Sequence, residues 1–126
     1  MYLIGGLDNI NLMLDKKAKI SIVTPCFNEE ENISNLYKKI KEIMINLDYA
    51  YEHIVIDNCS TDKTVEILTN LAKNDLNLKV ILNAKNYGHI RSPYYGLLQA
   101  SGDCAILMAS DFQDPPELIT EFINKW

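Results

Sequence analysis

The sequence has 126 residues, 48% of them hydrophobic, which is enough to build the core of one domain but not of two. Its 12 basic and 17 acidic residues give a net charge of −5 without a basic cluster, which argues against nucleic acid as a partner. The three cysteines, Cys26, Cys59 and Cys104, lie far apart without C-x-x-C spacing, so we expect reduced thiols in a cytoplasmic protein and neither disulfides nor a zinc site.

The first 18 residues contain Gly5-Gly6 and show no clear periodicity, so residues 1–18 are treated as a leader of uncertain structure. No basic residue precedes their short apolar stretches, which disfavours a secretory signal. No run in the sequence approaches the roughly 18 apolar residues of a membrane span.

After the leader, short β-branched runs alternate with runs of helical spacing. The runs of the first kind predict four buried strands, at 19–25, 51–57, 78–82 and 104–109. The runs of the second kind predict a helix over 32–47, a helix carrying Val65, Leu68, Leu71 and Ala72, a helix within 86–103, and a helix running through Leu118, Ile119 and Phe122.

Several residues predict where these elements begin and end. The first strand should stop at Pro25. Ser60, Thr61 and Asp62 are capping residues for the second helix. Pro93 is tolerable in the first turn of the third helix, and Gly102 is placed to stop that helix. The last helix should begin with Asp114 as N-cap, Pro115 as its first residue and Glu117 in the third helical position.

Strands that alternate with helices predict a parallel sheet covered on both faces, because each crossover helix buries its apolar stripe against the sheet. Ligands of such open sheets bind beyond the carboxyl ends of the strands. Polar stretches follow all four predicted strands, and they read TPCFNEEEN, DNCSTD, NAKNYGH and SDFQD. We therefore look for the site in these stretches.

Acidic residues in these stretches have both structural and functional interpretations. Asp57 is typical of an Asx turn, but Ser60 or Asp62 already supplies a cap, which leaves Asp57 for a ligand. Glu30 and Glu31 are explained by the dipole of the helix that they open, so Glu29 is the candidate of that run. Asp111 ends a buried strand before the cap, where an acid pays desolvation unless it faces solvent, a cation or a hydroxyl-rich ligand.

His89 and Arg91 lie beside Gly88 at the start of a helix, an arrangement that can present backbone N–H groups and positive charge to a phosphate. Arg91 is equally compatible with a solvated surface position. Tyr94, Tyr95 and Phe112 are interpreted as packing residues.

The stretches ISIVTPCFNEEENI, VIDNCSTDKT, NYGHIRSPYYGLLQASGD and LMASDFQDPPELI together resemble the nucleotide-sugar-binding half of family 2 glycosyltransferases. Within that family they are most similar to the polyprenyl-phosphate glycosyltransferases. The resemblance covers residues 19–126 and implies a three-layer, Rossmann-like GT-A fold with a mostly parallel sheet. Because family members continue well beyond this length, the chain is expected to be the donor-binding part, truncated at its C-terminus.

The resemblance also implies roles for particular residues. Pro25, Phe27 and Glu29 would border the nucleobase and ribose, and Asp57 would hydrogen-bond the base. Asp111 and Gln113 would address the diphosphate through Mg²⁺ or Mn²⁺, which usually binds few protein oxygens and keeps several waters. Nucleotide-binding roles for Gly88 and Arg91 rest on the helix-start argument above.

The implied reaction is transfer of a sugar, with inversion, from a nucleotide-diphosphate sugar to an acceptor such as a polyprenyl phosphate, with membrane association of the full-length protein. The sequence departs from the family at three positions. Ala109 stands where an acid is usual, Asn58 replaces an Asp, and Cys59 replaces a Gly, which predicts that no positive φ is needed there. Two alternatives are a receiver-type domain phosphorylated on Asp57, and a folded but inert fragment that self-associates into a homo-oligomer.

Overall fold

The computed structural model describes residues 17–126, in which four strands and four helices alternate along the chain. The strands are β1 (Lys19–Cys26), β2 (Ala50–Asp57), β3 (Leu78–Leu82) and β4 (Cys104–Leu107). The helices are α2 (Ile33–Asn46), α3 (Thr64–Ala72), α4 (Gly88–Leu98) and α5 (Leu118–Lys125). The predicted order of elements is confirmed, whereas residues 1–16 of the predicted leader lie outside the described residues.

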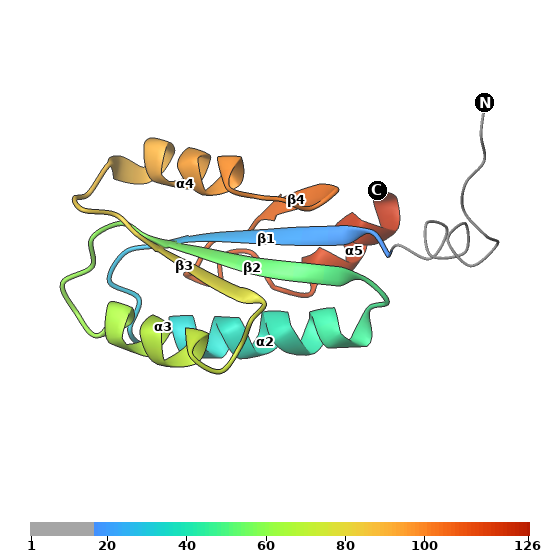
Figure 1. The fold of residues 1–126 in the computed structure, drawn as a ribbon, viewed down its shortest axis with the longest axis horizontal. Coiled ribbons are helices and arrows are strands. Elements are labelled where there is room, and N and C mark those ends of the chain that lie inside the picture. Colours follow the sequence, from blue (N-terminus) through green and yellow to red (C-terminus); the bar gives the residue numbers. More distant parts are fainter. Residues whose placement is uncertain (1–16) are drawn as a thin grey trace, which may run out of the picture.

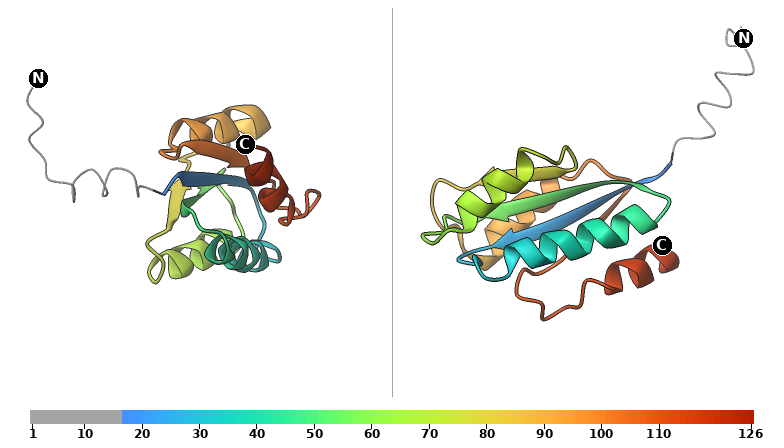
Figure 2. Two further views of the ribbon diagram at one scale, coloured as in Figure 1. Left: turned by 90° about the vertical axis from the view of Figure 1, so that its right-hand side faces the viewer. Right: turned by 90° about the horizontal axis from the view of Figure 1, so that it is seen from below.

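The strands form one sheet in the order β3-β2-β1-β4, and every neighbouring pair is parallel. Helix α4 covers one face of this sheet, and α2, α3 and α5 cover the other (Figures 1 and 2). The expected three-layer α/β architecture is therefore confirmed. All four strands end at the same edge, because parallel strands run in one direction.

The main core lies between β1, β4 and the two helices α2 and α5. It contains Ile20, Ile22, Leu36, Ile40, Met44, Ile106, Met108, Ile119 and Ile123, all of them buried. A second cluster between α2, α3, β2 and β3 contains Cys26, Ile33, Tyr37, Val55, Leu68 and Leu78. The apolar stripe predicted for the first helix is the face of α2 that enters both clusters.

Helix α4 approaches the sheet closely because it buries small residues. Its buried residues are Ser92 and Gly96, and a Cβ on Gly96 would lie 2.9 Å from Val23 Cγ1 and 3.1 Å from Ile56 Cγ2. The larger residues Ile90, Tyr94 and Leu98 are exposed.

Pro93 is the sixth residue of α4, so its predicted place in the first turn was wrong. Proline has no N–H, and the carbonyl of His89 therefore receives no bond from the residue four positions on. Strand β1 also continues one residue past its predicted stop, because Pro25 pairs with Ile56 and Cys26 pairs with Asp57.

The predicted helix boundaries at Gly102 and Asp114 were wrong. Helix α4 ends at Leu98, and Gly102 instead packs against β1, where an added Cβ would lie 2.6 Å from the Lys19 carbonyl oxygen. Helix α5 begins at Leu118 with Glu117 as N-cap, and Asp114 lies in the bend that precedes it. The turn before the helix is made by backbone bonds, with Leu118 N–H donating to the Pro115 carbonyl at 3.0 Å.

The prediction that position 59 needs no positive φ was also wrong. Cys59 has φ 68°, Asn28 has φ 54° and Phe112 has φ 59°. Left-handed backbone costs a non-glycine residue roughly 1–2 kcal/mol. All three residues lie in loops that follow the carboxyl ends of strands, where the site is expected.

No helix within residues 17–126 combines the length and the apolarity that crossing a bilayer requires.

Candidate functional site

The carboxyl ends of β1 and β2, the start of α4 and the residues after β4 enclose a cleft of about 400 Å³. Its lining residues are Pro25, Cys26, Phe27, Glu29, Asn58, Asn86, Gly88, His89, Ser92, Pro93 and Ser110. The cleft lies at the edge where ligands of open parallel sheets bind. Of the residues predicted from the sequence, the structure places Pro25, Phe27, Glu29, Gly88 and His89 on its walls.

The wall made by the β1–α2 loop is fixed by hydrogen bonds to the β2–α3 loop. Asn28 N–H donates to Ser60 Oγ at 2.8 Å, and Asn28 Oδ1 accepts from the Thr61 N–H at 2.8 Å. Glu29 N–H donates to Thr64 Oγ1 at 2.8 Å. These contacts hold Glu29 in place through its backbone and leave its carboxylate bonded only to Asn32 among the described residues.

Glu30 belongs to the same pair of loops. Its Oε2 accepts from the Lys63 N–H at 2.8 Å, at the start of α3, and its own N–H donates to Asp62 Oδ2 at 3.1 Å. The prediction that Glu30 and Glu31 serve the dipole of the first helix was wrong, because α2 begins at Ile33 and has no acid in its first turn.

Asp57 is buried next to the cleft and is not one of its lining residues. Its Oδ2 accepts from the Ser60 N–H at 2.9 Å, and its Oδ1 accepts from the Ser60 hydroxyl, three residues further on. The N-cap residue of α3 is Lys63, and Asp62 Oδ1, one residue earlier, accepts from the Thr64 N–H at 2.9 Å. Asp57 therefore shapes the β2–α3 loop in this structure.

Cys26 lies between Asp57 and the cleft, with its Sγ 3.7 Å from Asp57 Oδ1. Burial, together with the negative charge of Asp57, raises the pKa of the Cys26 thiol well above its ordinary value of 9.0. The thiol stays protonated at neutral pH, so Cys26 is a wall residue and not a nucleophile.

The residues after β4 form the side of the cleft next to β1. Ser110 is buried and lines the cleft, and Asp111 follows it directly with an exposed side chain. Asp111 Oδ1 accepts from the Gln113 N–H at 3.1 Å, and Phe112 between them has positive φ. This tight turn leaves Asp111 Oδ2 and the Gln113 side chain without hydrogen-bond partners among the described residues.

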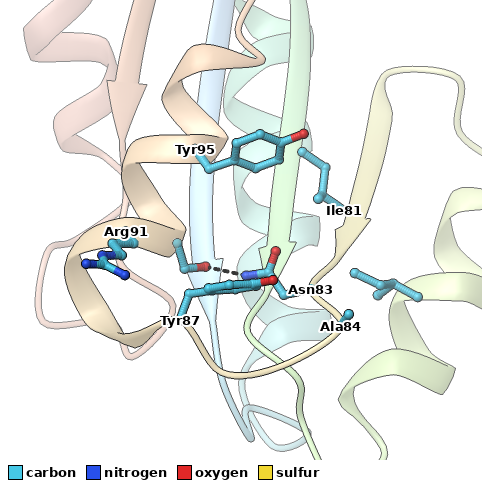
Figure 3. Close-up of a pocket in the computed structure, with 8 residues that line it drawn as sticks. Ile81, Asn83, Ala84, Tyr87, Arg91 and Tyr95 are labelled. Carbon is cyan, nitrogen blue, oxygen red and sulfur yellow. Dashed lines mark hydrogen bonds between the residues drawn. The ribbon is translucent and has the colours of Figure 1, made fainter.

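Arg91 lies outside the cleft. It lines a neighbouring cavity of about 440 Å³ between α4 and the end of β3, together with Tyr87 and Tyr95 (Figure 3). Ser92 borders both hollows, and its Oγ accepts from Asn83 Nδ2 at 3.0 Å.

Six cleft residues had no predicted role in the site. Cys26, Asn58 and Pro93 were named for other reasons, and Asn86, Ser92 and Ser110 were not singled out at all. Asn86 and Ser110 both fall in stretches that follow strands, so position in the predicted fold was the available signal. Ser92 lies one turn into a helix, and nothing in its sequence surroundings marks it.

A family model described as "Glycosyl transferase family 2" matches residues 21–126, which is nearly all of the described chain. The chain belongs to glycosyl transferase family 2. The match starts in β1 and includes every strand-end loop of the cleft. It gives no support to the receiver-type alternative.

Curated relatives include the bactoprenol glucosyl transferase of Shigella phage SfV, which is 39% identical over 86% of this chain and 35% of its own length. The undecaprenyl-phosphate 4-deoxy-4-formamido-L-arabinose transferase of Yersinia pestis is 36% identical over 84% of this chain and 33% of its own length. The chain thus spans about a third of the length of these relatives.

Among solved structures, S. aureus TarS in complex with UDP-GlcNAc superimposes with a TM-score of 0.63 and 29% identity, over 85% of this chain and 31% of TarS. A Pyrobaculum calidifontis mannosyltransferase in complex with GDP-Man and Mn²⁺ superimposes with a TM-score of 0.66 over 77% of this chain and 28% of its own. At 24% identity, this second likeness shows the fold alone.

Proposed function

We propose that this chain is the donor-binding part of an inverting glycosyltransferase and that its cleft binds a nucleotide-diphosphate sugar. The observation that carries the proposal is the cleft itself, a volume of about 400 Å³ at the carboxyl edge of the sheet in a chain of this family. Pro25, Phe27 and Glu29 would border the nucleoside, and Gly88 would present the start of α4 to the phosphates. Asp57 would contribute by shaping the loop beside the base.

A divalent cation, Mg²⁺ or Mn²⁺, is proposed to bind between Asp111 and the diphosphate. Among the described residues no three His, Cys, Asp or Glu side chains gather into a metal site, and Ala109 offers no side-chain oxygen where the family usually has an acid. A single carboxylate still suits Mg²⁺, which typically takes one or two protein carboxylates plus substrate phosphates and water. The free Oδ2 of Asp111 and the side chain of Gln113 would hold the cation, which would offset charge on the leaving diphosphate.

The acceptor is proposed to be a polyprenyl phosphate, because the names of two curated relatives specify bactoprenol and undecaprenyl phosphate. A lipid phosphate is already ionised near neutral pH and needs no general base to become a nucleophile. We propose this transfer, on the cytoplasmic face of a membrane, for the whole protein, because the chain spans only about a third of the length of each relative.

Calorimetric titration of the folded chain with UDP, GDP and their sugars, with and without Mn²⁺, tests the donor proposal. We expect at least one nucleotide to bind, and more tightly with Mn²⁺. Asp111→Asn should remove the gain that Mn²⁺ provides and leave metal-free binding unchanged. Asp114→Asn is the matched control, since Asp114 is also exposed and three residues further on. A folded chain that binds none of these nucleotides would contradict the proposal.

A further inference from the structure

The loop between β3 and α4 is attached to the end of β2 by one buried side chain, that of Asn58, which is 7% exposed. Its Nδ2 donates to Asn86 Oδ1 at 2.9 Å and to the Gly88 carbonyl at 3.2 Å. Its Oδ1 accepts from the Tyr87 N–H at 2.8 Å and from Asn83 Nδ2 at 3.2 Å. Two donors and two acceptors are the full capacity of a primary amide.

The direction of this amide is fixed by the backbone. The Tyr87 N–H can only donate and the Gly88 carbonyl can only accept, so the oxygen of Asn58 must face Tyr87 and its nitrogen must face Gly88. The Gly88 N–H donates to Asn86 Oδ1 at 2.8 Å, which identifies that atom of Asn86 as the oxygen. The nitrogen of Asn58 therefore faces two acceptors, Asn86 Oδ1 and the Gly88 carbonyl. Only a neutral amide satisfies all four groups.

We propose that Asn58 is a positioning residue for the nucleotide-sugar cleft, and that it holds the α4 wall in place only while it is an uncharged amide. Asn58, Asn86 and Gly88 all line the cleft, and Gly88 (φ 82°) begins α4. This inference rests on the proposed donor binding for its effect on affinity, and on the hydrogen bonds alone for its effect on the loop.

Replacement of Asn58 by aspartate isolates the role of the amide, because the two side chains have nearly the same shape. A carboxylate cannot donate, so it would face Asn86 Oδ1 and the Gly88 carbonyl with negative charge at a buried position. Burial and the two facing acceptors should raise the pKa of the new carboxyl, so the population of its protonated form increases as the pH falls. A protonated carboxyl donates one bond and restores part of the attachment.

The loop is tested through amide hydrogen exchange, expressed as protection factors at pH 7.5 and pH 5.5. In Asn58→Asp, protection of the Tyr87 and Gly88 amides should fall roughly 10-fold or more at pH 7.5 and recover in part at pH 5.5. The Met108 amide, which donates to the Val23 carbonyl at 2.8 Å, should keep its protection and controls for general destabilisation.

The same substitution at position 86 is the matched control for the loop. Asn86 is exposed, and its Oδ1 only accepts bonds, from Asn58 Nδ2 and the Gly88 N–H. Asn86→Asp should therefore keep the Tyr87 and Gly88 amides protected, whereas Asn86→Ala should expose Gly88. If Asn58→Asp does not fold, Asn58→Ala replaces it, because alanine removes all four bonds of the amide without adding charge; unchanged Tyr87 protection in that variant would overturn the proposal.

Nucleotide affinity provides the second readout. Asn58→Asp should weaken binding of UDP or GDP roughly 10-fold or more at pH 7.5, with a smaller loss at pH 5.5. Asn74→Asp adds the same charge at an exposed position away from the cleft and should leave affinity unchanged.

Two results would overturn the proposal: unchanged Tyr87 protection in Asn58→Asp at pH 7.5, or equal losses of protection in Asn58→Asp and Asn86→Asp. A wild-type chain that binds no nucleotide would contradict the proposed function, and the exchange data would then still decide whether Asn58 holds the loop.

Discussion

The buried side chain of His53 should make the stability of this chain fall when the pH drops from 7 to 5. His53 is 2% exposed on β2, with its Nε2 2.9 Å from Thr24 Oγ1 and its ring stacked on Tyr37. Its Nδ1 is buried without a hydrogen-bond partner among the described residues. Burial lowers the pKa of His53 from 6.5 to about 4, against a smaller opposing effect of Asp75.

The sign follows from where the proton binds first. As the pH falls below 6.5, the unfolded chain takes up a proton on His53 while the folded chain stays neutral down to about pH 4, so protons favour unfolding. Each unit of pKa difference is equivalent to about 1.4 kcal/mol. The free energy of unfolding therefore falls by about 2 kcal/mol between pH 7 and pH 5, and by about 3 kcal/mol in total once the pH is below 4.

The assay is equilibrium unfolding in urea at pH 7, 6 and 5, for wild type, His53→Gln and His89→Gln. His89 is the only other histidine and is exposed, so its replacement should keep the wild-type slope, whereas His53→Gln should flatten it. Burial opposes the charged forms of Glu52, Asp62 and Asp75, but hydrogen bonds outweigh it and lower their pKa values. Protonation of these carboxylates at acidic pH therefore lowers the free energy of unfolding as well, and it does so in all three proteins alike. Equal slopes for wild type and His53→Gln would refute the reasoning.

Two further predictions concern Gly102 and Cys59, where the structure overturned the expectation drawn from the sequence. Gly102→Ala should destabilise the fold by about 2 kcal/mol, because its Cβ would meet the Lys19 carbonyl oxygen at 2.6 Å; an unchanged urea midpoint would contradict this. Cys59→Gly should stabilise the fold by about 1 kcal/mol through relief of positive φ, and the comparison with Cys59→Ala separates the backbone effect from loss of the thiol. A lower midpoint for Cys59→Gly than for Cys59→Ala would count against the second prediction.

The order of elements was predictable because burial on both sides of a parallel sheet leaves a strong local pattern. The run at 78–82 and the stripe from Ile33 to Met44 match the observed β3 and the buried face of α2. Predictions that relied on a single residue type did worse. Gly102 was interpreted as a helix stop because glycine often serves that purpose, but here it is required by a close approach to β1 that only the tertiary fold creates.

The site was predictable in location and less so in detail. Strand-end position singled out Glu29, and the family resemblance added Pro25 and Phe27; all three line the cleft. Arg91 was assigned to the same site, yet it lines the neighbouring cavity. Successive residues of a helix point in different directions, so Ser92 reaches the cleft and Arg91 does not. The part played by Asn58 depends on four partners from a loop at least 25 residues away, which no local pattern records.

The hydrogen bonds between the β1–α2 and β2–α3 loops have a consequence for protein engineering. Asn28 and Glu30 donate hydrogen bonds to residues 60–63 and accept hydrogen bonds from them, so each loop holds the other in its conformation. A graft that imports one of these loops from a relative would leave backbone groups of its neighbour unmatched. Variants that reshape the cleft should therefore exchange both segments together.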